Sequence, residues 1–184
     1  MKTTQQTQQV FLKQIPTVSQ LFEGADVIDI KSVEAPGTLR EFIAGFAGYR
    51  PVFVDWLFWV RNVFARLLGL TSETLGEVTR PAPEDVPMTP GEQMLFTVKG
   101  AEEDRYWIAG ETASHLDFVV AIVVEPLAES INRYYVVTFV YYNQAVGRFY
   151  FMVIAPFHHL LVNLYMRAAV KTVRQRRRVK TQAA

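Results

Sequence analysis

The chain has 184 residues and a mass of 21.0 kDa, which is the size of one domain with a substantial core. Half of its residues are hydrophobic and 20% are charged, a balance that excludes a chain disordered throughout. The net charge is only +1, and the absence of cysteine excludes disulfides, iron–sulfur clusters and thiol catalysis.

The N-terminal segment MKTTQQTQQ is polar and lacks the apolar core of a secretory signal. We therefore interpret residues 1–10 as a disordered leader, residues 11–174 as a single domain and residues 175–184 as a basic tail. The missing signal also predicts a cytoplasmic protein.

The first predicted elements are a short strand at 26–33 and two helices. Thr38 and Glu41 have the spacing of a capping box at the start of the first helix, which is expected to end near Tyr49. Pro51 suits the first turn of the second helix, and Gly69 ends it. Residues 71–93 contain four prolines and predict a long loop, either a surface connection or a lid.

Consecutive strands follow, at about 94–99, 105–111, 114–124 and 133–143, and a helix is predicted from 146 to 174. Strands in succession without intervening helices indicate an antiparallel sheet and an α+β fold. The two long strands are apolar on both faces, although an antiparallel sheet with one face in water alternates apolar and polar residues. We therefore expect short helices, a subunit partner or a bound ligand to cover the second face.

The apolar stretch 149–166 precedes a basic segment, as a membrane anchor would. It also contains Pro156, His158, His159 and Asn163. A helical projection places eight apolar residues on one face: Tyr150, Val153, Ile154, Phe157, Leu160, Leu161, Leu164 and Ala168. A one-sided stripe is typical of a helix packed on a core, so we interpret the stretch as a core helix.

His115 and Asp117 are the most suggestive polar pair, since residues i and i+2 of a strand share a face. They could act as an acid/base pair, bind a polar ligand group, or form a structural hydrogen bond. Ser114 points away in a regular strand, which argues against a Ser-His-Asp triad.

His158 and His159 are adjacent on a helix and diverge by about 100°. With only one further histidine in the chain, no metal site is predicted, and both are interpreted as surface residues. The sequence lacks nucleotide-binding, hydrolase and metalloprotease motifs, so neither a nucleotide nor another cofactor is predicted.

Most tyrosines of the chain lie between 134 and 165, among them Tyr135, Tyr141 and Tyr150. Their hydroxyls could lie at the rim of a ligand cavity, although each tyrosine side chain could equally pack in the core. Asn143 and Arg148 bracket the turn before the last helix, where they could cap the helix or contact a ligand.

The segments SHLDF at 114–118 and TFVYYNQAVGRFYFMVIAPFHHLLV at 138–162 resemble the bacterial domain-of-unknown-function 2867 family. The matching residues are His115, Leu116, Asp117, Phe118, Asn143, Gly147, Arg148, Tyr150, Ile154, Pro156, Phe157 and His158. This resemblance implies a helix-grip fold similar to START and polyketide-cyclase-like (SRPBCC) proteins, in which a curved sheet wraps a long C-terminal helix. It implies no catalytic residue, because the family has no established activity.

The sequence thus favours a binding protein over an enzyme without deciding between them. The first hypothesis is a small hydrophobic or amphipathic ligand between the sheet and the last helix, with polar contacts at His115, Asp117, Tyr135, Tyr141, Asn143, Arg148, Tyr150 and His158. The second is an enzyme that uses His115 and Asp117. The third is a homodimer whose basic tail contacts an anionic membrane or nucleic acid through Arg174, Arg176, Arg177 and Arg178.

Overall fold

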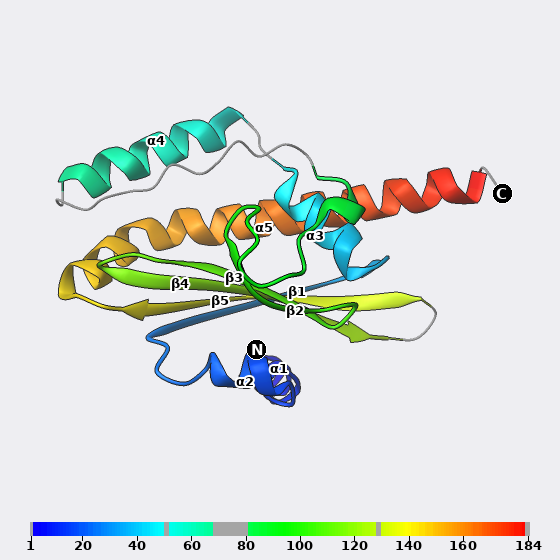
Figure 1. Ribbon diagram of the computed structural model, residues 1–184, viewed down its shortest axis with the longest axis horizontal. Coiled ribbons are helices and arrows are strands. Elements are labelled where there is room, and N and C mark those ends of the chain that lie inside the picture. The colour runs from blue at the N-terminus through cyan, green and yellow to red at the C-terminus, as the bar shows by residue number, and fades with distance from the viewer. Residues whose placement is uncertain (1, 50–51, 68–80, 128–129, 183–184) are drawn as a thin grey trace.

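The computed structural model describes residues 2–49, 52–67, 81–127 and 130–182, and Figure 1 shows how their elements are arranged. The strands are β1 (Val27–Pro36), β2 (Thr97–Glu102), β3 (Tyr106–Thr112), β4 (Leu116–Pro126) and β5 (Ile131–Tyr142). The helices are α1 (Lys2–Lys13), α2 (Pro16–Gln20), α3 (Leu39–Ala47), α4 (Val52–Leu67), the 3₁₀ turn η1 (Pro83–Asp85) and α5 (Ala145–Gln182).

The strands form a five-stranded sheet in the order β1-β5-β4-β3-β2, and each neighbouring pair is antiparallel. Strands β2 to β5 follow one another in space as they do in the chain. Strand β1 lies at the opposite edge because two helices, α3 and α4, separate it from β2. Helix α5 runs along one face of the sheet (Figure 1). These features confirm the predicted antiparallel α+β fold of the helix-grip type.

Helices α1 and α2 cover the face of the sheet opposite to α5 (Figure 1). Leu12, Ile15 and Val18 are buried there against residues of β3, β4 and β5, and Phe11 stacks on Tyr135 at 5.4 Å. The prediction of a disordered leader at 1–10 is therefore wrong, since residues 2–13 form one helix. The polar residues at the start of this helix suggested disorder, but the helix packs on the sheet through Phe11 and Leu12 at its C-terminal end.

This arrangement explains why β4 and β5 are apolar on both faces. Odd-numbered β4 residues such as Val119, Ala121 and Val123 face α1 and α2, and even-numbered ones such as Val120 and Ile122 face α3 and α5. The second face is thus covered within a single chain, but by N-terminal helices that the sequence did not predict, whereas the predicted helix α3 packs on the same face as α5.

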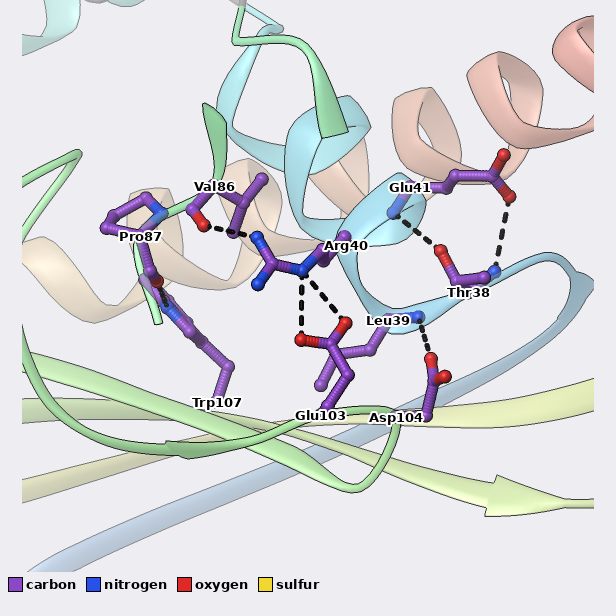
Figure 2. A network of polar contacts seen from close by, with 9 residues as sticks. All are labelled: Thr38, Leu39, Arg40, Glu41, Val86, Pro87, Glu103, Asp104 and Trp107. Atoms are coloured by element: carbon purple, nitrogen blue, oxygen red, sulfur yellow. Dashed lines mark hydrogen bonds and ion pairs between the residues drawn. The ribbon is translucent and has the colours of Figure 1, made fainter. Parts of the chain in front are cut away.

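A capping box begins α3, as predicted. The Thr38 hydroxyl accepts a hydrogen bond from the Glu41 amide, and the Glu41 carboxylate accepts one from the Thr38 amide, both at 3.2 Å. The β2–β3 turn adds a second anchor, because the Asp104 carboxylate accepts a hydrogen bond from the Leu39 amide (Figure 2). The helix start is thereby fixed to the sheet.

Segment 81–88 is held over the same end of the sheet (Figure 2). Arg40 donates to Glu103 and to the Val86 carbonyl oxygen, each at 2.8 Å, and the Trp107 indole N–H donates to the Pro87 carbonyl oxygen at 2.9 Å. Of the predicted loop 71–93, residues 71–80 lie outside the described residues, so the structure does not test its role as a lid.

Helix α5 continues to Gln182, so the predicted basic tail at 175–184 is helical through that residue. Its buried residues include Phe151, Val162, Met166 and Val173. The predicted apolar face is only partly correct, because Tyr150 is buried whereas Val153, Phe157 and Leu160 are exposed. The segment is apolar on more than one side, so periodicity alone did not identify the side that faces the sheet.

Among the described residues, α5 is the one helix long and apolar enough to cross a bilayer when judged by length and composition. In this fold it is a core helix, because it packs on α3, β1 and β5. Gly45 of α3 permits a close approach there: a Cβ at this position would lie 2.9 Å from the Ala169 Cα atom of α5.

Candidate functional site

A cluster of polar side chains lies between α5 and the edge of the sheet. Asp29 of β1 and Thr138 of β5 are directly opposite each other in the antiparallel register. Two consecutive α5 residues reach this pair: His158 Nε2 lies 3.1 Å from the Thr138 hydroxyl oxygen, and His159 Nδ1 lies 3.0 Å from the Asp29 carboxylate. The adjacent histidines therefore diverge, as predicted, but onto two neighbouring strands.

Lys31 completes the cluster, and we call Asp29, Lys31, Thr138, His158 and His159 the polar cluster. Lys31 follows Asp29 by two residues on β1, so both side chains point to the same face. Its ammonium forms an ion pair with Asp29 and lies 3.1 Å from His159 Nδ1.

The protonation state of His159 decides how these three groups interact. A protonated Nδ1 donates to the Asp29 carboxylate, whereas an unprotonated Nδ1 accepts from the Lys31 ammonium. The same nitrogen cannot do both. The polar cluster can thus redistribute its hydrogen bonds when a polar group of a ligand replaces one of these partners.

His158 lies at the apolar end of the polar cluster. Its ring is surrounded by Phe118, 5.8 Å away between ring centroids, and Phe151, 6.1 Å away. Burial lowers the pKa of His158 to about 4, even though the Asp29 carboxylate favours the protonated ring. The imidazole is therefore neutral at pH 7, with one nitrogen that donates and one that accepts.

The opposite end of the polar cluster reaches solvent. The side chain of His159 is 47% exposed, whereas those of Asp29 and Lys31 are 18% and 16% exposed. Strand β1 is an edge of the sheet, so the polar cluster lies at the edge of the layer between the sheet and α5.

The structure does not bring His115 and Asp117 into one site. Strand β4 begins at Leu116 and the chain bends just before it, so strand alternation does not extend to His115. The His115 ring is buried edge-on against Tyr150 of α5, at 5.0 Å between ring centroids. Asp117 instead lies opposite Tyr141 in the register, on the face that α1 and α2 cover.

The predicted tyrosines are also divided between the two faces. Tyr135 donates to Glu125 at 2.6 Å, and Tyr141 donates to the Leu21 carbonyl oxygen, both on the side of α1 and α2. Burial, with a further contribution from the Asp117 carboxylate, raises the pKa of Tyr141. Neither hydroxyl lies between the sheet and α5.

Asn143 holds the turn before α5. Its side-chain amide donates to the Ala113 carbonyl oxygen and to the Asp117 carboxylate, both at 3.0 Å. Arg148 is exposed one turn into α5. Of the predicted ligand-binding residues, only His158 belongs to the polar cluster, and Tyr150 lies on the same side of the sheet, near the start of α5.

Sequence reasoning missed Asp29, Lys31, Thr138 and His159. The sequence contains a signal for Asp29, Lys31 and Thr138. Asp29 and Lys31 alternate with Ile28 and Ile30 in β1, and Thr138 interrupts a run of apolar residues in β5. These three residues come together beneath the two histidines of α5 only because β1 pairs with β5, and that pairing could not be predicted from the sequence.

Within the part of the chain that the structure describes, no group of three or more His, Asp or Glu residues is placed to hold a metal ion. The polar cluster is a set of hydrogen-bonding groups beside the aromatic rings of Phe118 and Phe151. The element order and this layer define a helix-grip α+β protein.

The chain belongs to the family described as "Protein of unknown function (DUF2867)", which matches residues 21–165. The match leaves out α1, α2 and the C-terminal half of α5. No curated protein matches the chain. Among solved structures it is similar to norcoclaurine synthase from Thalictrum flavum, a point mutant bound to a transition state analogue, with 11% identity, a TM-score of 0.42, and coverage of 82% of this chain and 96% of that one.

Proposed function

We propose that the protein binds a small amphipathic or hydrophobic molecule between the sheet and α5, with its polar group at the polar cluster. The observation that carries this proposal is that charged and hydrogen-bonding side chains are half-buried in an otherwise apolar layer. Small-molecule sites typically combine apolar walls with a few such groups.

Lys31 is the residue best suited to bind the polar group of the ligand. An ammonium has three N–H donors, and among the described residues its partners are Asp29 and His159. A carboxylate, carbonyl or hydroxyl oxygen of a ligand could accept the remaining hydrogen bond. The neutral His158 ring, with Phe118 and Phe151 beside it, suits the apolar part of the molecule next to that oxygen.

The experiment uses cis-parinaric acid, a fluorescent molecule with one carboxylate and one long apolar chain. We expect saturable binding to the purified full chain, and we expect Lys31→Met to weaken it about fivefold or more, in line with the value of a hydrogen bond to a charged group. Lys99→Met, which removes an exposed lysine from β2, is the matched control and should bind as the native protein does.

Native mass spectrometry of the freshly purified protein provides a second measurement. A co-purifying organic molecule that is lost in Lys31→Met and retained in Lys99→Met would support the proposal. Absence of saturable parinarate binding, or equal binding by both variants when circular dichroism shows both to be folded, would overturn it.

The acid/base alternative at His115 and Asp117 lacks the shared face that it requires, so binding is the function that the geometry supports. A cytoplasmic location and homodimerisation remain predictions.

A further inference from the structure

Helix α4 presents an apolar stripe to solvent. Its exposed residues include Trp56 and Trp59, each 62% exposed, and Leu67, whereas Val54 and Ala65 on the other side are buried. In Figure 1, α4 forms an outer layer beyond α5, on the side away from the sheet. Two exposed tryptophans on one side of an amphipathic helix are typical of a segment that lies in a membrane–water interface.

Helix α5 carries a second exposed stripe, which is apolar near the start of the helix and basic further along. At 100° per residue, the apolar and the basic residues fall within the same broad face of the helix. The exposed apolar residues are Phe149, Met152, Val153, Phe157 and Leu160, and the exposed basic residues further along are Arg167, Lys171, Arg174 and Arg178. One side of the helix is thus apolar in its first half and cationic in its second.

All the Asp, Glu, Lys and Arg charges of α5 are positive. Its sequence from Ala145 to Gln182 contains eight Lys and Arg residues and no Asp or Glu. Such a helix end attracts an anionic surface, and juxtamembrane basic residues gain affinity from anionic lipid headgroups. A second copy of the chain would bring no acidic residue from its own α5 to pair with these cations.

We propose that the exposed faces of α4 and α5 dock the protein on an anionic bilayer surface. Trp56 and Trp59 enter the interface, and Arg174 and Arg178 contact the phosphate or carboxylate headgroups. The helices lie on the membrane rather than crossing it, because the other side of α5 is buried in the core through residues such as Val162, Met166 and Val173. This docking is independent of the ligand proposed above.

The test measures binding of the full chain to vesicles of phosphatidylcholine alone and of phosphatidylcholine with phosphatidylserine. We expect flotation with the phosphatidylserine vesicles, reduced by high salt, and little with phosphatidylcholine alone. Arg174→Gln with Arg178→Gln should weaken binding roughly thirtyfold. Lys99→Gln with Arg105→Gln removes the same charge from β2 and the β2–β3 turn and should leave binding unchanged.

Fluorescence quenching by brominated phosphatidylcholine, included in the phosphatidylserine vesicles, tests insertion. The chain has three tryptophans, and the third, Trp107, is buried with its indole bonded to the Pro87 carbonyl oxygen. We expect strong quenching in the native protein and almost none in Trp56→Phe with Trp59→Phe, where only Trp107 remains.

Failure to float with anionic vesicles, or flotation without quenching of Trp56 and Trp59, would overturn the proposal. A concentration-dependent dimer that is lost with the tryptophan substitutions, in a protein that ignores vesicles, would assign the surface to a second copy instead.

Discussion

His158 and Thr138 form a hydrogen-bonded pair across the interface between α5 and β5, with 3.1 Å between Nε2 and the hydroxyl oxygen. Thr138 is 1% exposed and belongs to a strand whose other central residues are apolar. A buried polar atom costs free energy unless it is hydrogen-bonded, so each of these side chains requires the other.

The first prediction is that acid destabilises the protein through His158. Its pKa is about 4 when folded and about 6.5 in an unfolded chain, so between these values the unfolded state binds the extra proton. The free energy of unfolding should therefore fall as the pH drops from 6.5 to 4, by about 3 kcal/mol at most. Urea unfolding at pH 7.0 and pH 4.5 measures the fall.

The variant His158→Gln keeps a hydrogen-bonding side chain but cannot titrate in this range, and its pH dependence should be smaller than that of the native protein. His159→Gln leaves His158 in place and should retain the fall. A titration of the His158 ring by NMR with a midpoint near 6.5 would contradict the prediction.

Thr138→Val should leave the buried His158 nitrogen without its hydroxyl partner while nearly preserving side-chain shape. We expect a loss of about 1–2 kcal/mol in the free energy of unfolding, typical of a buried group that loses its hydrogen bond. Thr138→Ser keeps the hydroxyl and serves as the control. If denaturant unfolding showed Thr138→Val to be as stable as the native protein, the hydrogen bond would carry no net stabilisation.

Gly147→Ala should be strongly destabilising, because a Cβ at this position would lie 2.1 Å from the His115 carbonyl oxygen. The start of α5 and the chain before β4 would have to separate, which we expect to cost about 2 kcal/mol or more. Gly100→Ala is the comparison, since a Cβ there would meet no atom within 4 Å. Thermal unfolding of the two variants should give clearly different midpoints.

Leu12→Ala tests whether α1 belongs to the folded core. Leu12 is fully buried in the cluster under the sheet, so its truncation should reduce the free energy of unfolding by about 2–5 kcal/mol. Val10 is exposed on the same helix, and Val10→Ala should change stability by less than about 0.5 kcal/mol. Equal stability of the two variants in urea would show that α1 does not belong to the folded core.

The local pattern of the sequence was sufficient for the fold class and for the order of elements from β1 onward, but it did not reveal α1 and α2. The Thr38–Glu41 capping box and the runs of strand-forming residues each act within a few residues, so their signals do not depend on knowledge of the fold. The same holds for the divergence of His158 and His159, which follows from helix geometry alone. The predicted role of Pro51 lies outside the described residues.

The candidate site required the tertiary structure. Asp29 and Thr138 are far apart in the sequence, and only the pairing of β1 with β5 places them side by side beneath α5. The rotation of α5 was equally inaccessible, because a helix with apolar residues on several sides does not encode which side is buried. Sequence by itself determined the elements from β1 onward, since their hydrogen bonds are local. Packing decided that the N-terminal segment folds onto the sheet and which polar groups meet, since both depend on contacts between distant segments.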